Sequence, residues 1–365
     1  MLNGRIMIFP VNLNGKEDII MPRGSYRPQI VVDTSNLTEE EWLDYRRGGI
    51  GGSDVSIIYG ISHFRTGREL YYDKLGIKPI REIEDTTWLQ KKIGHVLEEV
   101  VAELFAYKTG LTVYEDKKMY SHPLYPFMRA DVDRFVITKN GKKGLLECKT
   151  TNYENKDAWA DGKFPYQYEL QVRHYLAVMN LDFAYIACLW GNNEKDFVYR
   201  CIKRDIEFED EIIEMEQNFW NEYIVKKVEP PFVESPDMAL RCLSRYLASP
   251  SSGYSKKTLP SNLQDNIEKY LILKEQKSKI DADSKKLEEE IKRLSIPIIE
   301  EMGSFHESVL NVSGKSFKVS YKPKKDVRIK KDNLEKLAVH HKEIYDEYVS
   351  KSESRTLSIK EMKVS

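Results

Sequence analysis

The spacing of apolar positions predicts several helices in the first part of the chain. Thr38 opens a Thr-x-x-Glu start ahead of Trp42, which is the signature of a helix N-terminus. A longer helix is expected from about residue 86 to Gly110, and another over residues 166–180. The expected buried stripe of the longer helix is made of Val96, Leu97, Val100, Val101 and Leu104.

Shorter apolar runs bounded by turn residues predict strands. They are TVYED (112–116), ADVDRFVIT (130–138), GLLECKTT (144–151), DFAYIACLW (182–190) and DFVYRCIKR (196–204). The second and third runs flank KNGKK, whose Asn-Gly pair is typical of a hairpin turn. This order of helices and strands predicts an α/β core with a mixed central sheet flanked by helices.

The pattern changes after SPSSGYS (249–255), which we interpret as a linker. The chain then divides into a leader at 1–37, a core at 38–248 and a helical, basic C-terminal extension at 256–365. In the extension, Leu or Ile recurs every seven residues from Leu273 to Leu294, but Lys277 and Ser284 occupy alternate seam positions. The half-apolar seam favours a helical hairpin, or a helix packed on the core, over a long dimeric coiled coil. Pro297 is expected to kink or end the helix.

Charge is balanced over the whole chain but not along it. The 57 Lys and Arg residues face 58 Asp and Glu residues. Residues 1–250 carry six more acidic than basic residues, whereas residues 251–365 carry five more basic than acidic ones. Lys315 to Lys331 holds eight basic residues and one acid, which fits either a solvated edge or a strip that binds phosphates.

Several classes of protein are disfavoured by composition. No apolar run reaches the roughly 18 residues that would span a membrane. The N-terminus lacks the features of a signal peptide, and the four cysteines are scattered without a CxxC pair. We therefore expect a cytoplasmic protein with reduced thiols and with neither a zinc site nor a disulfide framework.

Chemistry is concentrated in GLLECKTTN (144–152). Glu147 and Lys149 are two residues apart, so they share one face of an otherwise apolar strand. Acid-x-Lys alone is also compatible with a simple ion pair. With Asp133 on the preceding strand, however, the arrangement is that of a metal-dependent phosphodiesterase, in which carboxylates and a backbone carbonyl hold Mg²⁺ and the lysine acts on a water.

The hairpin register decides whether Asp133 can join that site. A two-residue turn on Asn140-Gly141 would place Asp133 opposite Cys148, on the wrong face. A three-residue loop over 140–142 would place Asp133 opposite Lys149, on the same face as Glu147. We therefore predict that the hairpin is not a simple two-residue one, or that it contains a bulge.

The ordered set of motifs resembles the lambda-exonuclease-like, YqaJ-type phage recombinase nucleases of the PD-(D/E)xK superfamily. The resemblance spans residues 42 to about 225. The matching stretches are WLDYRRGGIGGSDVSIIYGIS (42–62), ELYYDKLG (69–76), GHVLEEVVAELFAYKTG (94–110), MRADVDRFV (128–136), GLLECKTTN (144–152) and YELQVRHYLAVMNLDFAYIACL (168–189).

The resemblance implies a role for each matching residue. Asp133, Glu147 and the Cys148 carbonyl are implied metal ligands, and Lys149 is the implied catalytic lysine. The remaining implied site residues are Glu98 as the helix carboxylate, Gln171 as the group that positions the water or the lysine, and Arg46, Ser53 and Asp54 as the lining of a pocket for DNA and its terminal phosphate. Val132 replaces the usual proline before the aspartate, which is not a ligand. Asp131 competes with Asp133, and Glu99 competes with Glu98; spacing to the apolar positions favours Asp133 and Glu98.

The implied activity is Mg²⁺-dependent digestion of linear double-stranded DNA, 5′ to 3′, for phage-type recombination, with Mn²⁺ as a substitute. The resemblance also implies a possible homotrimer, a single-strand annealing protein as partner, and a phage or prophage origin. A restriction-like endonuclease uses the same core and stays open as an alternative. A Cas4-like nuclease would need clustered cysteines for an iron–sulfur site, and a catalytically silent DNA-binding module would lack at least one of the five acidic, Lys and Gln side chains, all of which are present.

Overall fold

The computed structural model describes residues 26–81, 88–247, 257–323 and 331–349. The chain divides into two units, Met1–Ser249 and Pro250–Ser365, which we describe separately. Within the described ranges, no helix has both the length and the apolar character needed to cross a membrane.

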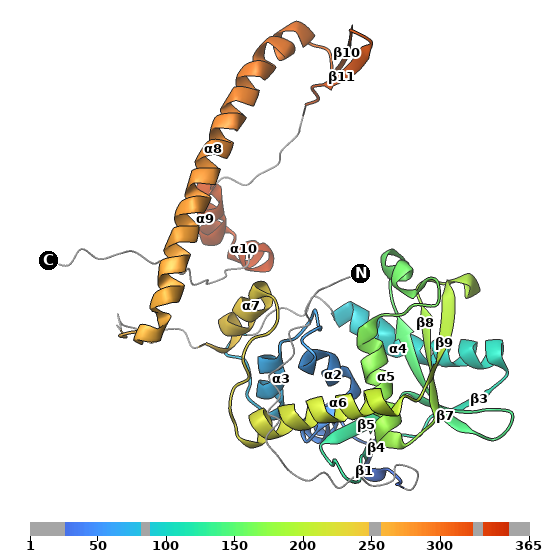
Figure 1. Ribbon diagram of the computed structural model, residues 1–365. Coiled ribbons are helices and arrows are strands. Elements are labelled where there is room, and N and C mark those ends of the chain that lie inside the picture. Colours follow the sequence, from blue (N-terminus) through green and yellow to red (C-terminus); the bar gives the residue numbers. More distant parts are fainter. Residues whose placement is uncertain (1–25, 82–87, 248–256, 324–330, 350–365) are drawn as a thin grey trace. The chain divides into compact units, whose positions relative to one another are not determined.

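Figure 1 shows the helices and strands of the first unit. Its helices are α1 (Glu39–Arg47), α2 (Gly52–Ile58), α3 (Gly67–Lys74), α4 (Trp88–Thr109), α5 (Tyr166–Met179), α6 (Ile206–Phe219) and α7 (Pro236–Tyr246). Its strands are β1 (Gln29–Asp33), β2 (Ile50–Gly51), β3 (Thr112–Tyr114), β4 (Lys118–Ser121), β5 (Met128–Asp131), β6 (Arg134–Ile137), β7 (Lys143–Thr150), β8 (Phe183–Leu189) and β9 (Phe197–Lys203). The predicted start of α1 is confirmed, since Thr38 and Glu41 form a reciprocal capping box.

Two sheets organise this unit. The larger has the order β3-β6-β7-β8-β9, in which β7 and β8 run parallel and the other neighbours run antiparallel. The smaller has the order β1-β4-β5-β2. One face of the larger sheet packs on α5 through Val172 and Leu176, and the other packs on α4 through Val101 and Phe105. The predicted mixed sheet flanked by helices is confirmed.

The run ADVDRFVIT is not the single strand that the sequence predicts. It is split into β5, which pairs with β4 and β2 in the smaller sheet, and β6, which pairs with β3 and β7 in the larger one. Val132 and Asp133 lie at the change of sheet. A corner between two sheets frees Asp133 from ladder pairing and leaves its side chain available to the neighbouring strand.

The β6–β7 hairpin has a three-residue loop, which confirms that it is not a simple two-residue turn. Ile137 pairs with Lys143, Thr138 N donates to Lys142 O at 2.9 Å, and Gly141 N donates to Thr138 O at 2.9 Å. The loop covers residues 139–141, one position earlier than expected, because Gly141 supplies the left-handed residue (φ 79°) that closes such a loop. If the register that pairs Arg134 with Leu146 is extended by one residue, Asp133 lies opposite Glu147. The expected partner, Lys149, is therefore wrong, but Asp133 is still on the same face as Glu147.

The buried stripe predicted for α4 is only partly right. Val101 is buried and Leu97 and Leu104 are half-buried, but Val96 and Val100 are exposed. The helix instead turns Val101, Ala102 and Phe105 toward the sheet, because its C-terminal half is the part that packs against β7 and β8.

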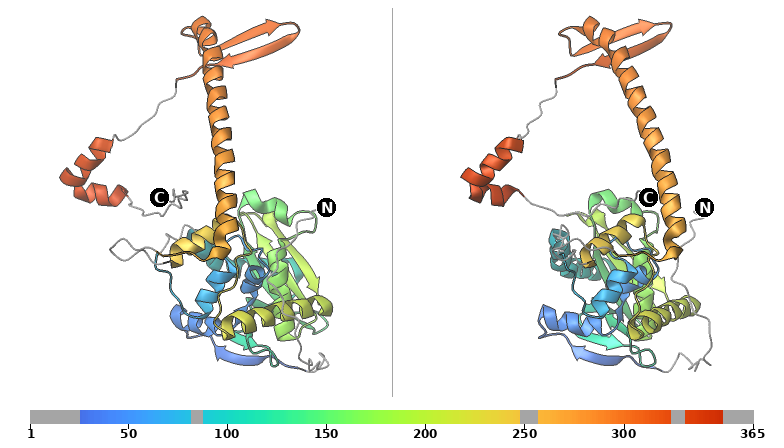
Figure 2. Two further views of the ribbon diagram at one scale, coloured as in Figure 1. Left: turned by 60° about the vertical axis from the view of Figure 1, so that its left-hand side comes forward. Right: turned by 90° about the vertical axis from the view of Figure 1, so that its left-hand side faces the viewer.

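The second unit contains α8 (Gln264–Met302), β10 (Glu307–Val312), β11 (Lys315–Ser320), α9 (Lys331–His340) and α10 (Lys342–Tyr348). Figure 2 shows α8 as one long helix followed by the β10–β11 hairpin. The expected helical hairpin is therefore wrong, and the helix continues past Pro297 to Met302. A proline removes a single helical hydrogen bond, and in a helix of 39 residues this loss does not end the element.

Within this unit, the seam residues Leu273, Ile280, Leu287 and Leu294 are exposed. The basic segment that begins at Lys315 is described only in part, since residues 324–330 lie outside the described ranges. In the described part, Lys318 and Lys322 each form an ion pair with Glu307. Its phosphate-binding role stays a prediction.

Candidate active site

Strand β7 presents Glu147 and Lys149 on the face that α5 covers. Glu147 is nearly enclosed, with 3% of its surface exposed. Lys149 Nζ lies 2.5 Å from Glu147 Oε1, and Gln171 Nε2 on α5 donates to the same oxygen at 2.6 Å. Glu147 Oε2 is buried and has no hydrogen-bond partner among the described residues. An unpartnered buried carboxylate oxygen is costly, so this atom is the one that a bound cation would satisfy first.

Asp133 approaches β7 from the corner between the two sheets. Its Oδ2 accepts a hydrogen bond from Cys148 N at 2.8 Å. A strand residue directs its N–H and C=O to the same edge, so the Cys148 carbonyl faces the side on which Asp133 lies. The structure thus brings Asp133 next to Glu147 and the Cys148 backbone, whose roles as ligands stay predictions.

Asp131, the competing aspartate, is bound elsewhere. Its Oδ2 accepts a hydrogen bond from Trp42 Nε1 on α1 at 2.6 Å. Burial raises the pKa of Asp131, and the indole N–H acts against that rise. The contact fastens α1 to the end of β5. It favours a structural role for Asp131 and supports the choice of Asp133 as the site residue, which stays a prediction.

Helix α4 adds Glu98 from the opposite face of the sheet. Arg134 Nη1 donates to Glu98 Oε1 at 2.6 Å, and Arg134 Nη2 donates to Glu99 Oε2 at 2.7 Å. The exposed fraction is 27% for the Glu98 side chain and 66% for that of Glu99. Burial, and then the charge of Asp133, raise the pKa of Glu98. Glu98 is therefore the acid that faces the strand carboxylates, while Glu99 faces outward.

The acids of this site repel one another. Burial, and then the charge of Asp133, raise the pKa of Glu147 to about 8. Burial also raises the pKa of Asp133, against the opposing effect of Lys149. Burial would lower the pKa of Lys149, but the charges of Glu147 and Asp133 outweigh it, so the pKa is raised and the side chain is an ammonium ion. The site carries more acid than Lys149 neutralises, and it favours the uptake of a proton or a cation.

The residues fit a divalent cation in the type of their donors. Carboxylates of Glu98, Asp133 and Glu147 and a strand carbonyl are hard oxygen ligands, which Mg²⁺ prefers. The buried, unpartnered Glu147 Oε2 agrees with this interpretation. In the part of the chain that the structure describes, no three His, Cys, Asp or Glu side chains are already gathered as a metal cluster. Lys149 and Gln171 both bind Oε1 of Glu147, and Arg134 binds Oε1 of Glu98, so the unpartnered Oε2 of Glu147 is the oxygen that these contacts leave for a cation.

A second charged cluster surrounds Asp54 at the start of α2. Lys74 Nζ donates to Asp54 Oδ2 at 2.7 Å, Arg46 Nη2 donates to Asp54 Oδ1 at 3.0 Å, and Gly51 N donates to Asp54 Oδ2 at 3.1 Å. Arg46 Nη2 also donates to Ser53 Oγ at 2.9 Å. The structure thus brings together the three residues predicted to line a phosphate pocket.

Asp54 is the most enclosed of the three, since only 1% of its surface is exposed. Burial would raise its pKa, but Lys74 and Arg46 outweigh burial and lower the pKa below its usual range. Its negative charge would also repel a phosphate. These contacts favour a supporting role, in which Asp54 fixes Arg46, whose side chain is 24% exposed, while Ser53 is exposed at the surface. The expected roles of all three residues stay predictions.

Glycines let the two clusters approach each other. A Cβ at Gly52 would lie 2.7 Å from Tyr175 Cε1 and 2.9 Å from Gln171 Cγ. A Cβ at Gly49 would lie 2.5 Å from Phe127 O. No residue of the stretch 48–52 has a positive φ, so these glycines serve close packing: Gly52 lets α2 pack on α5, the helix that carries Gln171, and Gly49 lets the chain approach the Phe127 carbonyl.

Sequence reasoning missed three residues of these clusters. The sequence pattern places Arg134 in a strand, Lys74 in a matching stretch and Trp42 in a helix, but it assigns no partner to any of them. The signal that could have found Arg134 is its place beside Asp133, a predicted site residue, and its charge in an apolar strand. Nothing in the local sequence links Lys74 or Trp42 to partners 20 and 89 positions away.

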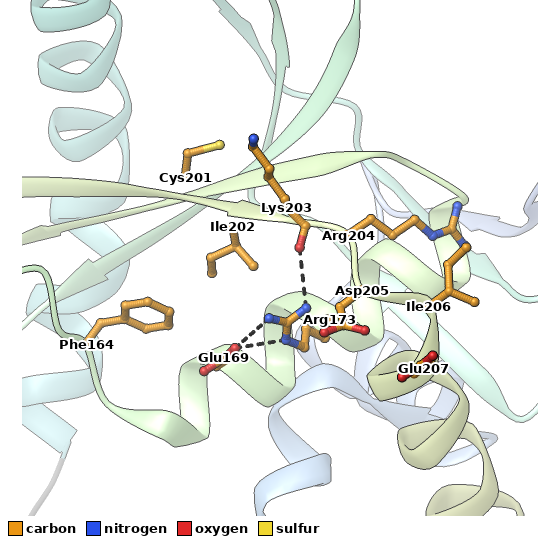
Figure 3. A pocket seen from close by; sticks show the side chains of 10 residues that line it. All are labelled: Phe164, Glu169, Arg173, Cys201, Ile202, Lys203, Arg204, Asp205, Ile206 and Glu207. Carbon is orange, nitrogen blue, oxygen red and sulfur yellow. Dashed lines mark hydrogen bonds and ion pairs between the residues drawn. The ribbon is translucent and has the colours of Figure 1, made fainter.

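A pocket lined by residues of α5, β9 and the start of α6 is shown in Figure 3. It measures about 730 Å³, and its lining includes Arg173 and Lys203. Arg173 is held by Glu169 on its own helix and by Lys203 O. The lining contains none of the residues predicted for the site, so this pocket does not bear on the chemistry.

Comparison with known proteins gives a family and several relatives. A family model described as the YqaJ-like viral recombinase domain matches residues 41–182. That range contains every predicted site residue, from Arg46 to Gln171. The protein YqaJ of Bacillus subtilis (strain 168), described as uncharacterized, is 36% identical over 270 residues, which cover 73% of this chain and 82% of that protein.

Solved structures with a similar fold are more distant. The alkaline exonuclease LHK-Exo from Laribacter hongkongensis is 22% identical, with a TM-score of 0.42, and the match covers 51% of this chain and 93% of that one. A phage-related exonuclease from Haemophilus somnus 129PT is 16% identical, with a TM-score of 0.34, and the match covers 49% of this chain and 96% of that one.

Proposed function

The chain belongs to the YqaJ-like viral recombinase family, and from this premise we propose that it is a metal-dependent deoxyribonuclease that degrades linear double-stranded DNA from its ends. The observation that carries the proposal is the meeting of Asp133, Glu147 and Lys149 beside Gln171, at a corner between two sheets. A structural ion pair would need neither the second buried acid nor the unpartnered Glu147 Oε2.

In this proposal Glu98, Asp133, Glu147 and the Cys148 carbonyl hold Mg²⁺ or Mn²⁺. When bound, the cation would offset charge on the scissile phosphate and lower the pKa of a coordinated water. Lys149 is an ammonium ion, so it does not act as a base in this state. It donates hydrogen bonds, and it would hold the attacking water or a phosphate oxygen while Gln171 keeps Glu147 in place.

The second cluster supports an end-dependent mode of action. Arg46, fixed by Asp54, would bind a terminal phosphate through charge-assisted hydrogen bonds. A pocket for a 5′-phosphate beside the cleavage site would set a 5′ to 3′ direction, which is part of the proposal, as is participation in phage-type recombination.

An end-labelled digestion separates this proposal from its alternatives. Linear and closed circular duplexes, each strand labelled at either end, are incubated with Mg²⁺ and with EDTA. We expect loss of 5′ label from linear DNA as mononucleotides, no cleavage of closed circles, and no reaction in EDTA. Linearised circles would identify an endonuclease, and DNA binding without cleavage would identify a silent binding module.

A further inference from the structure

Arg134 lies between the two elements that carry the acidic site residues. It follows Asp133 directly, and only 8% of its side chain is exposed to solvent. It lies in β6 on the face that α4 covers, opposite Leu146. A buried guanidinium in an apolar strand has a high desolvation cost, so its partners explain why it is there.

The guanidinium joins three groups at once. Nη1 donates to Glu98 Oε1 at 2.6 Å and to Asp133 O at 2.6 Å, and Nη2 donates to Glu99 Oε2 at 2.7 Å. Glu115 Oε1 lies further away, at 3.8 Å. One side chain therefore spans from the backbone of the catalytic aspartate to the carboxylate of the facing helix.

We propose that Arg134 is a positioning residue that fixes the distance between the Glu98 carboxylate and the strand carboxylates, and so sets the affinity of the site for its divalent cation. This inference rests on the proposed function. Without the hydrogen bonds from Arg134, the Glu98 carboxylate would be repelled by Asp133 and would turn toward solvent. When Arg134 holds Glu98, the side chain of Glu98 loses its conformational entropy during folding, so this cost does not reduce the affinity for the cation.

Arginine is required because of its shape. Its planar fork carries five N–H donors and can bond two carboxylates and a carbonyl in one plane. A lysine keeps the charge, but its single nitrogen cannot reach Glu98, Glu99 and Asp133 O together. Outer residues that orient metal ligands contribute on the order of 10- to 100-fold to metal affinity. We expect a loss of that size from Arg134→Lys.

The test measures Mn²⁺ binding by calorimetry on the full chain without DNA. Arg134→Lys should weaken Mn²⁺ affinity about 10-fold or more. It should also raise the Mg²⁺ concentration for half-maximal cleavage by a similar factor, while turnover at saturating Mg²⁺ stays close to that of the wild type. The matched control is Arg204→Lys, a comparably buried arginine bound to Glu209 and Asn180 in the same unit, which should not change either value.

A double-mutant cycle separates positioning from general loosening. If Arg134 acts through Glu98, Arg134→Lys should weaken Mn²⁺ binding by less than about two-fold in a Glu98→Gln background. Equal losses in both backgrounds, or unchanged affinity in Arg134→Lys alone, would overturn the inference. Circular dichroism and melting check folding, and Arg134→Gln replaces the lysine variant if that variant is unfolded, with at least as large an expected loss.

The outcome also separates this inference from the proposed function. A wild-type chain that neither binds Mn²⁺ nor cleaves DNA would refute the nuclease proposal. If the wild type binds Mn²⁺ and cleaves DNA, and Arg134→Lys binds Mn²⁺ as tightly as the wild type, only the positioning role of Arg134 would be refuted.

Discussion

Two buried acids of the first unit, Glu147 and Asp54, have opposite electrostatics. Both are almost entirely enclosed. The pKa of Glu147 is raised to about 8 by burial and then by Asp133. The pKa of Asp54 is lowered, because Lys74 and Arg46 outweigh its burial. Burial is common to both, so the neighbours make the difference.

The comparison shows how charge balance separates a site that favours the uptake of a cation from one whose charges are already neutralised within the fold. Asp54 has two cations and a backbone N–H as partners, so its charge is already compensated. Glu147 shares one lysine with Asp133 and keeps one oxygen without a partner. The Asp54 cluster is therefore compensated by its own partners, whereas the Glu147 cluster favours the uptake of a proton or a divalent cation.

The largest expected effect is on the Glu147 cluster. Lys149→Ala should reduce DNA cleavage about 10²–10³-fold, the loss that follows removal of one well-placed electrostatic donor, and should leave DNA binding intact. Single-turnover digestion of linear duplex in Mg²⁺ and an equilibrium binding assay in Ca²⁺ measure the two quantities. Lys142→Ala, at the exposed position directly after the β6–β7 loop, is the control and should cleave as the wild type does. Normal turnover in Lys149→Ala would contradict the assignment of the site.

Substitution in the Asp54 cluster should change the stability of the fold. Asp54→Asn leaves Lys74 buried without its counter-ion and should lower the free energy of unfolding by about 3–5 kcal/mol. Urea denaturation measures it. Asp44→Asn on the neighbouring helix removes an exposed partner of Arg47 and should cost less than about 1 kcal/mol. Equal values for the two variants would show that burial of Asp54 does not matter energetically.

These two clusters also show which features of the structure can be predicted from the sequence. The capping box at Thr38 and the shared face of Glu147 and Lys149 follow from short-range rules, and the structure contains both. The split of ADVDRFVIT at Val132 cannot be predicted from the sequence, because strand propensity does not indicate which sheet a strand joins. The pairing of Lys74 with Asp54 and of Trp42 with Asp131 depends on helix packing across long sequence separations. The exposed Val96 and Val100 show that helical periodicity alone cannot tell which of two apolar faces meets the sheet.

The pH dependence of the metal-free protein should sharpen the contrast. The folded state holds a proton on Glu147 more tightly than the unfolded state does, since its pKa is raised from the model-peptide value to about 8. Its contribution to stability is therefore lost as pH rises from about 4.5 to about 8. Glu147→Gln should remove that part of the slope in denaturation curves recorded in EDTA. A slope identical in the variant would show that Glu147 titrates normally in the folded chain.

The same shift predicts proton release on metal binding. Below pH 8, Glu147 must lose its proton before it can bind a cation, so Mn²⁺ affinity should rise with pH up to about that value and then level off. Calorimetry in two buffers of different ionisation enthalpy counts the protons released. Affinity that does not change between pH 6.5 and 8.5 would place Glu147 outside the metal site.

The smallest expected effect concerns the exposed side of the Asp54 cluster. Arg46→Ala keeps the Asp54–Lys74 pair but removes the partly exposed guanidinium beside Ser53. A charge-assisted phosphate contact contributes about 1.5–3 kcal/mol, so the preference for a 5′-phosphorylated over a 5′-hydroxyl end should fall roughly 10-fold or more. Competition between the two ends in one digestion measures this preference. Arg47→Ala, one position further along α1 and paired with Asp44 and Asp73, is the matched control and should leave it unchanged. A wild type without any phosphate preference would remove the support that this cluster gives to 5′ to 3′ digestion, while the nuclease chemistry of the first cluster would stand.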